Sequence, residues 1–566
     1  MNYRVIGIGV GVGVLLTFPL LGVLFIASEL SGLPFVPYDV FDWVTRVLPG
    51  SVVTFGLELM IDSLRYMGLG LSETVKIAER TIAVLQVLVG GAVVGALLAW
   101  ITRRSDLRGS LVIGAGIGSV VGVAMSIVSI YIDGSDVSPV LVILWLVLAF
   151  SAWGVALGFV KFRLVTDLRA RETETFVPEV SRPIGRREFV VRVGASVAVI
   201  TVASTWVGSL LAVAARREID AAIASSVATP TPTSVAASGA VAEATASATE
   251  VPIPMIERMP FPNDDDPVVA VQGTRPEYTA VEDHYKVSIR SRPTVVDGSE
   301  WSLSISGLVA NPLSLSINDL RRDFEPRSEF VTLSCISGWV GSSLISTTQW
   351  TGLSVQDLLD RVQPNKDALY LDITCADGFH ELVDLQLIRS DERIMLCYAW
   401  NGEPLPIDHG YPLRIWLPDR YGMKQPRWIE KIEVTDKYRA GYWVARGWDE
   451  VARVEPTSVI DVIDADSKFE VDGQTFVPVG GIAFAGSKQI SKVEVRADDG
   501  EWQEAELRSP LSETTWVVWR YDWPFEAGNH KFEVRCETGS GTPQSDQDRG
   551  THPSGATGIH SRRAKL

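Results

Sequence analysis

Five apolar stretches in the first part of this 566-residue chain are each about long enough to cross a bilayer as a helix. They lie near Val5–Ala27, Thr81–Ile101, Ser110–Ile132, Ser138–Val160 and Val193–Ala215. These runs are almost free of charge and are apolar on all faces, which is typical of membrane helices rather than of core helices in a soluble domain. We therefore predict an α-helical transmembrane domain over residues 1–221.

Basic residues mark the cytoplasmic side of this predicted bundle. They cluster in two connections, with Arg103, Arg104 and Arg108 after the second stretch and seven Lys or Arg residues from Lys161 to Arg187 after the fourth. The connection between the third and fourth stretches carries Asp133 and Asp136 and no base. This pattern predicts a multi-pass protein of the cell membrane whose second half is extracytoplasmic. The segment from Ser28 to Arg80 is then an outer loop with amphipathic pieces such as Phe41–Leu48 at the interface, and its role cannot be read from the sequence.

The chain changes character after the last stretch. Residues 222–263 are rich in Ala, Ser, Thr and Pro, which predicts an extended linker. The three aspartates that follow, Asp264–Asp266, are interpreted as the solvated end of this linker rather than as a metal site. The net charge of −17 comes largely from the second half and argues against a nucleic-acid partner.

Residues 264–455 show a mixed α+β pattern. Strands are expected at Trp301–Gly307, Val331–Leu333, Ala368–Thr374 and Ile394–Tyr398, and helices at Leu315–Asp323 and Ser354–Val362. The most distinctive stretch is FVTLSCISGWVGSSLISTTQWTGL, from Phe330 to Leu353, in which a β-rich segment delivers Cys335 to a loop of Gly and Ser. Taken alone, such a cysteine is either a buried structural thiol or a thiolate ligand to a soft metal.

The stretch resembles the molybdenum-cofactor segment of the sulfite oxidase family, with Leu333-Ser334-Cys335 and the later Trp350-Thr351-Gly352 turn. The similarity runs from about Thr274 to the C-terminal tail. The resemblance implies that Cys335 binds molybdenum carried by one pyranopterin, as catalytic residue and metal ligand. The other cysteines, Cys375, Cys397 and Cys536, have no metal-ligand spacing and are expected to be buried thiols.

A second run resembles the pterin-binding half of the same family. It contains His409 five residues before Arg414, then Gly422-Met423-Lys424 followed by Arg427 and a Trp. A planar guanidinium and two further cations suit a dianionic phosphate. The resemblance therefore implies cofactor binding by His409, Arg414, Gly422, Met423, Lys424 and Arg427, and with less specific matches by His284, Thr374 and Asp377.

Departures from the family pattern concern the substrate. Sulfite oxidases surround a dianion with arginines and a tyrosine. Here Val340 stands five residues after Cys335 where the family has Arg, Glu282 replaces another base, and Trp448 takes the place of the active-site Tyr. Trp448 and Arg446 are therefore the candidate catalytic residues beside Cys335, although Arg446 is equally readable as a surface cation. These exchanges favour a neutral or cationic S- or N-oxide over sulfite.

The resemblance implies a two-electron oxygen-atom transfer whose direction the sequence does not specify. No haem, flavin or iron–sulfur motif is expected in this chain, because the first His is His284 and no CxxCH or dinucleotide unit is found. Electrons would then be exchanged with a separate carrier, a cytochrome or a quinone-linked protein. Export of a cofactor-loaded domain also explains the segment 185–215, where Arg186-Arg187-Glu188-Phe189 resembles a twin-arginine signal. Taken alone, an arginine pair at a cytoplasmic boundary is more often a topology charge, and the need to export a cofactor-loaded domain favours the signal.

Residues 456–566 are predicted to be all-β, with a strand–turn–strand unit at Thr475–Phe484 and strands at Ser491–Arg496, Thr515–Tyr521 and His530–Cys536. They resemble the immunoglobulin-like dimerisation domain of the family, which implies a homodimer. The tail from His552 to His560 also occurs in bacterial members, which predicts that it docks. Two alternatives stay open, namely a sulfite dehydrogenase and a non-catalytic cell-surface binding module.

Overall fold

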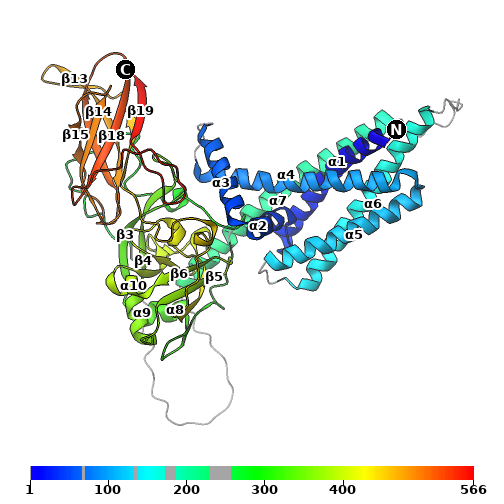
Figure 1. Ribbon diagram of the computed structural model, residues 1–566, viewed down its shortest axis with the longest axis horizontal. Helices are drawn as coiled ribbons and strands as arrows, with labels where there is room; N and C mark the ends of the chain where they lie inside the picture. Colours follow the sequence, from blue (N-terminus) through cyan, green and yellow to red (C-terminus); the bar gives the residue numbers. More distant parts are fainter. Residues whose placement is uncertain (1, 67–70, 133–136, 173–185, 229–256, 293) are drawn as a thin grey trace, which may run out of the picture. The chain divides into compact units, whose positions relative to one another are not determined.

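The computed structural model describes residues 2–66, 71–132, 137–172, 186–228, 257–292 and 294–566 (Figure 1). The chain divides into two compact units. The first comprises Met1–Leu48, Lys76–Ala221 and Arg290–Arg292, and the second comprises Pro49–Val75, Ala222–Ile289 and Pro293–Leu566. We refer to them as the membrane unit and the catalytic unit.

The membrane unit contains long apolar helices at the positions that the sequence predicts. Five of them in the described residues are long and apolar enough to cross a bilayer: Tyr3–Ser31, Lys76–Arg104, Leu107–Ile132, Pro139–Thr166 and Val191–Leu211. They belong to α1 (Asn2–Ser31), α4 (Leu71–Ile101) with the short η1 (Thr102–Arg104), α5 (Leu107–Ile132), α6 (Pro139–Glu172) and α7 (Arg186–Ala228). The prediction of five apolar helices is confirmed.

Glycine allows α5 and α6 to pack closely. A Cβ on Gly114 or Gly118 would collide with the backbone carbonyls of Gly154 and Phe150 on the facing helix. Small residues permit such close contact between membrane helices. Van der Waals packing matters there because the hydrophobic effect does not drive helices together in lipid. Gly114 and Gly118 are therefore explained by close packing on α6.

Three expectations about connecting segments need correction. The loop from Ser28 to Arg80 holds helices of its own, α2 (Val36–Val47) and α3 (Gly50–Tyr66). Helix α7 continues to Ala228, so the first residues of the predicted linker are helical, and residues 229–256 lie outside the described residues. Asp266 is also more than a solvated linker end, because it accepts hydrogen bonds from the backbone N–H groups of Val268 and Ser509.

The first part of the catalytic unit packs two sheets around one core. One sheet has the order β2-β1-β10-β5-β6, in which β1 and β10 are parallel. Its strands are β2 (Leu313–Ser316), β1 (Ser302–Gly307), β10 (Ile429–Thr435), β5 (Tyr370–Cys375) and β6 (His380–Asp384). The other has the order β3-β4-β7-β8, with β9 also on β7. Its strands are β3 (Arg327–Ser334), β4 (Ile345–Ser354), β7 (Met395–Trp400), β8 (Glu403–Pro404) and β9 (Arg414–Trp416).

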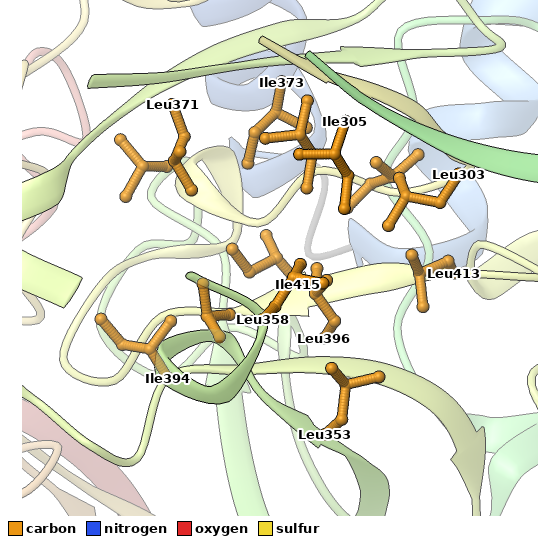
Figure 2. Packing of buried hydrophobic residues seen from close by; sticks show 14 of the residues in the cluster. Leu303, Ile305, Leu353, Leu358, Leu371, Ile373, Ile394, Leu396, Leu413 and Ile415 are labelled. Atoms are coloured by element: carbon orange, nitrogen blue, oxygen red, sulfur yellow. The ribbon is translucent and has the colours of Figure 1, made fainter. Parts of the chain in front are cut away.

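Aliphatic side chains from both sheets fill the space between them (Figure 2). Ile305 and Ile373 come from one sheet, and Leu396 and Ile415 from the other, all nearly inaccessible to water. The helices α8 (Ile317–Asp323), α9 (Val355–Val362) and α10 (Leu385–Ser390) complete this part. Ser316 and Ser354 begin α8 and α9 as N-caps that accept a backbone hydrogen bond. The mixed α+β pattern predicted from the sequence is confirmed.

The C-terminal part is a sandwich of two antiparallel sheets with a shared core. Their orders are β11-β13-β17-β16, with β12 on β13, and β15-β14-β18-β19. The longer strands are β11 (Thr457–Ile463), β13 (Gln474–Phe484), β14 (Ile490–Ala497), β17 (Val517–Pro524), β18 (Asn529–Thr538) and β19 (His560–Lys565), and the short ones β12 (Phe469–Val471), β15 (Gln503–Glu504) and β16 (Glu506–Leu507). Val479 and Trp519 of the first sheet share a buried cluster with Val495 and Phe532 of the second.

The predicted turn within Thr475–Phe484 is wrong. Residues Gln474–Phe484 form one uninterrupted strand that pairs with both β11 and β17. Gly481 serves close approach instead of a turn, because a Cβ there would collide with the carbonyl of Val459 and with the ring of Trp519.

Candidate active site

Cys335 follows the last residue of β3 and opens the loop that returns to β4. Its backbone N–H donates to the carbonyl of Leu344 at 2.9 Å, and its carbonyl accepts from Gly338 N–H at 3.1 Å, which closes the loop on itself. Its Sγ lies 3.1 Å from Oγ of Ser337. All four cysteines of the chain are described, and Cys335 alone is not fully buried. The other three, Cys375, Cys397 and Cys536, are buried thiols as predicted.

A cavity opens beside this thiol. Its empty space is about 480 Å³, counting the part open to solvent, and its wall includes Cys335, Trp339, Val340 and Tyr421. Arg275 also faces it, but its guanidinium is committed to Asp461 at 3.0 Å and to the carbonyls of Ser342 and Gly341. The cavity wall therefore combines apolar and polar surface, and its arginine is already neutralised.

Two histidines lie together in a buried aromatic setting. The ring of His284 lies 5.1 Å from that of His409, and both rings lie 4.5 Å from the indole of Trp400, measured between centroids. His284 Nδ1 is 3.2 Å from the carbonyl of Tyr285. The Nε2 atoms of both histidines are buried without a hydrogen-bond partner in the described part of the chain. Such atoms are rare in native proteins and indicate a place for a polar ligand.

Two guanidinium groups lie next to these rings. The Arg414 carbon Cζ is 4.3 Å from the Trp350 ring and 5.0 Å from the Trp400 ring, and Nη1 donates to the carbonyl of His409. Arg427 donates to the carbonyls of Asp408 and Val287 and lies over Trp428. Among the described residues, no carboxylate lies within ion-pair distance of either guanidinium. Arg427 is half-buried, and attraction to Asp377 and Asp408 opposes the fall of its pKa that burial causes. Arg414 is buried, and a buried cation without a counter-charge is unfavourable unless an anion binds.

The pKa shifts of these residues agree with a site that is positively charged and ready to bind an anion. Burial, reinforced by the positive charge of Arg414 and Arg427, lowers the pKa of His284 to about 3. The pKa of His409 also falls well below its usual range, chiefly through burial. Burial, followed by repulsion from Arg427, lowers the pKa of Arg414 to about 9. The histidines are thus neutral at physiological pH, and the positive charge resides on the arginines.

Lys424 belongs to the short helix η5 (Gly422–Lys424), and its ammonium is held by Glu381 at a distance of 2.7 Å. Glu381 Oε2 is buried without a hydrogen-bond partner among the described residues. In the same turn, a Cβ on Gly422 would come within 2.8 Å of the Tyr285 hydroxyl, so this position needs a very small residue. Met423 is buried in the apolar cluster that also holds Tyr421 and Trp448.

The other predicted site residues are spread more widely. Trp448 is buried, with edge-to-face contacts to Trp443 and His552. The guanidinium of Arg446 lies over the ring of Tyr442 at 3.6 Å and donates to that residue's carbonyl, so it is not simply a solvated surface cation.

Asp377 and Thr374 lie at the end of β5. Asp377 is buried and accepts the backbone N–H of Phe379. Thr374 is half-buried, with His380 and Lys431 as its cross-strand neighbours. The buried cluster itself is formed by His284, His409, Arg414 and Arg427, with Lys424 committed to Glu381.

The cluster fits a molybdopterin. The guanidiniums of the buried Arg414 and the half-buried Arg427 suit its phosphate, the two histidine Nε2 atoms lack partners among the described residues, and Cys335 lines a cavity. Sequence reasoning missed Trp400, Tyr285 and Glu381. None has a local signal, because each gains its place only through strand pairing and through loops distant in sequence.

Comparison with known proteins gives the family of the chain. Residues 290–443 match the family described as oxidoreductase molybdopterin binding domain. Relatives include the uncharacterized oxidoreductase YuiH of Bacillus subtilis, 30% identical over 28% of this chain and 76% of that protein. A putative protein-methionine-sulfoxide reductase subunit, YedZ1 of Azospira oryzae, is 29% identical over 27% of this chain and 56% of its own.

Three further relatives match over a smaller share of their own length. The mitochondrial sulfite oxidase of Macaca fascicularis is 24% identical over 48% of this chain and 55% of that protein. The chain spans less than a third of the fungal nitrate reductases that it also matches, 28% of the Fusarium oxysporum enzyme and 20% of the Leptosphaeria maculans enzyme. Among solved structures, the sulfane dehydrogenase SoxCD of Paracoccus pantotrophus matches with a TM-score of 0.46 and 19% identity, over 52% of this chain and 82% of that chain.

Proposed function

Because the chain belongs to the sulfite oxidase family of molybdopterin-dependent oxidoreductases, we propose that it is a membrane-anchored, extracytoplasmic enzyme that transfers an oxygen atom. The observation that carries this proposal is the position of Cys335. This residue lines a cavity, and Arg414 and Arg427 provide positive charge for an anionic ligand within the same unit.

Each residue of the cluster would bind a different part of the cofactor. Arg414 and Arg427 supply charge for the phosphate, and His284 and His409 offer neutral ring nitrogens to polar edges of the pterin. Lys424 adds a cation whose charge is shared with Glu381. Cys335 provides a thiolate ligand. Burial raises the pKa of this thiol, and binding of the metal offsets the free-energy cost of its deprotonation. The bound molybdenum cofactor supplies two-electron redox chemistry.

A neutral S-oxide is the substrate class that we favour, with an N-oxide as a close relative. The wall beside Cys335 is lined by Val340 and Trp339, and the nearby Arg275 is neutralised by Asp461. Such a wall offers little to a dianion such as sulfite. Similarity to a putative protein-methionine-sulfoxide reductase subunit supports the same choice.

In the reductive direction the S–O bond breaks, and the sulfoxide is reduced to a thioether. Two electrons and two protons are consumed, and the oxygen leaves as water. The electrons come from a separate one-electron carrier, a cytochrome or a quinone-linked protein. The twin-arginine segment at 185–215 would export the loaded domain; its residues from Arg186 onward belong to α7, and residue 185 lies outside the described residues. We further propose that the C-terminal sandwich is immunoglobulin-like and forms a homodimer.

A dye-linked assay on the purified full chain, made in a host that produces the cofactor, tests the function. With a reduced viologen as electron donor, we expect turnover of uncharged sulfoxides at micromolar to millimolar KM and poor oxidation of sulfite with an acceptor dye. Preference for sulfite over every S- and N-oxide would replace the proposal with a sulfite dehydrogenase. Fully loaded protein that turns over none of these compounds would also contradict it.

A further inference from the structure

Helix α3 (Gly50–Tyr66) comes from the connection between the first and second apolar spans, yet it belongs to the catalytic unit. It has two distinct faces. Thr54 and Ile61 are each 4% exposed, whereas Phe55 and Leu59 on the other face are 65% and 58% exposed. A segment more than 200 residues before Cys335 in sequence is therefore part of the packing of the unit that holds this thiol.

The first half of α3 contacts η6 (Val444–Arg446), just before Trp448. A Cβ on Gly50 would come within 2.7 Å of the Arg446 Cα, and Thr54 Oγ1 donates to the Arg446 carbonyl at 2.9 Å. Glu58 then lies 3.7 Å from His552, whose ring packs on Trp448. The helix thus meets both the Trp448 loop and the C-terminal tail.

The inner face of α3 packs against two apolar clusters that residues of the Cys335 loop also contact. Ile61 is a member of the apolar cluster that contains Tyr285 and Leu344, and Leu57 and Met60 pack against this cluster, as do Cys335 and Trp339. Leu57 also packs against the cluster of Trp448, as Val340 does. Leu57 therefore lies where the clusters on the two sides of the Cys335 loop meet.

We propose that α3 forms one wall of the substrate approach to Cys335, with Leu57 and Met60 as specificity-determining side chains. An apolar wall at this place excludes water and binds the hydrocarbon part of an uncharged sulfoxide, while it gives an anion no partner. This inference deepens the proposed function and rests on it for the identity of the substrate. The role of α3 as a cover over Cys335 has a separate test.

That test is the reaction of Cys335 with a neutral thiol reagent, iodoacetamide, in the cofactor-free full chain. The other cysteines are buried, so peptide mass spectrometry assigns the labelled site. Leu57→Ala and Met60→Ala are expected to increase the labelling rate of Cys335 several-fold. Phe55→Ala and Leu59→Ala, on the exposed face of the same helix, are expected to leave it unchanged. Equal labelling rates of Cys335 in all four variants would overturn the proposal that α3 covers this residue.

The second test compares a small and a bulky uncharged sulfoxide, dimethyl sulfoxide and methyl phenyl sulfoxide, in the molybdenum-loaded protein. Trimming Leu57 or Met60 is expected to change the ratio of their kcat/KM values by about tenfold, mainly through KM, as expected when a few methylene groups of a pocket are lost. Met60→Gln, which keeps the length of the side chain, serves as a second variant should the alanine variants fold poorly, and it is expected to raise KM for the bulky sulfoxide. A loss of kcat for both sulfoxides with an unchanged ratio of their kcat/KM values would show that α3 only supports the structure. That result would overturn its role in specificity.

The two proposals fail in different ways. If loaded wild-type protein turns over neither sulfoxide, the proposed function is wrong, and the labelling experiment still decides whether α3 covers Cys335. If wild-type protein is active but the inner-face variants keep its labelling rate and its substrate ratio, the inference about α3 alone is wrong.

Discussion

The ammonium of Lys424 lies 2.7 Å from Oε1 of Glu381, and the two side chains are only 9% and 1% exposed. Burial raises the pKa of Glu381, and the attraction of Lys424 opposes that rise. A lysine expected to face a phosphate is thus already paired inside the protein. The pair keeps one cation from being buried alone before the cofactor binds.

Breaking this pair is expected to destabilise the catalytic unit. Lys424→Met leaves a buried carboxyl without its partner, and the free energy of unfolding should fall by about 3 kcal/mol. Chemical denaturation of the cofactor-free full chain, followed by tryptophan fluorescence, measures it. The matched control is Lys431→Met, because the Lys431–Glu433 pair is about half exposed and is expected to contribute about 0–1 kcal/mol. Equal losses in the two variants would contradict the assigned role of burial.

Removal of one guanidinium from the cluster should prevent cofactor retention. Arg414→Met removes the charge that lies over the rings of Trp350 and Trp400, and we expect the pterin content of purified protein to fall at least tenfold. The content is measured by fluorescence of the oxidised pterin. Arg439→Met, which removes an exposed partner of Asp372, should retain wild-type content. Normal pterin content in Arg414→Met would place the phosphate elsewhere.

The buried histidines make the cofactor-free protein sensitive to acid. In the folded protein burial lowers the pKa of His284 to about 3, whereas an unfolded histidine has a pKa near 6.5. Between these values the unfolded chain binds a proton that the folded protein does not bind, so stability is complete above pH 6.5 and is lost as the pH falls toward 3. At pH 5 this histidine should cost about 2 kcal/mol relative to pH 7.5.

The experiment compares unfolding free energies of wild type and His284→Gln at the two pH values. The variant should lose less stability on acidification, by about 2 kcal/mol, because it lacks the group that titrates only on unfolding. An identical loss in both proteins would mean that His284 is protonated in the fold or is accessible to water.

Val340 gives a direct test of the substrate argument. This side chain lines the cavity beside Cys335 at the position where the resemblance predicts an arginine for sulfite oxidases. Val340→Arg should lower KM for sulfite about tenfold and raise KM for uncharged sulfoxides, because a cation on this wall attracts a dianion. Val340→Leu controls for volume and should leave sulfite oxidation unchanged. Steady-state kinetics with dyes in both directions measure the effect, and better sulfoxide binding in the arginine variant would contradict the argument.

Sequence reasoning succeeds where the signal is local or repeats along the chain. The membrane helices follow from uninterrupted apolar runs, and β3 and β7 from short β-rich segments. The family is predicted from the motifs around Cys335 and Arg414, and the matches to known proteins confirm the family. The position of each proposed cofactor ligand remains a prediction carried by that resemblance.

Other features depend on contacts between segments that are distant in the chain. Glu381 meets Lys424 from 43 residues away, and no local pattern distinguishes it from a surface glutamate. The docking of α3 is equally invisible, because Leu57 and Phe55 look alike in sequence while only one of them packs inward. Gly481 looked like a turn residue, but its strand neighbours decide that it serves close packing.

The most direct test of the central claim is X-ray absorption at the molybdenum edge of the purified, loaded protein. Wild type should contain about one molybdenum per chain, and its spectrum should show sulfur scatterers from the pterin and from Cys335. Cys335→Ser should either lose the metal or show one sulfur fewer around it, whereas Cys536→Ser, at a buried thiol that contacts Gln544, should match wild type. An unchanged sulfur number and metal content in Cys335→Ser would contradict the account.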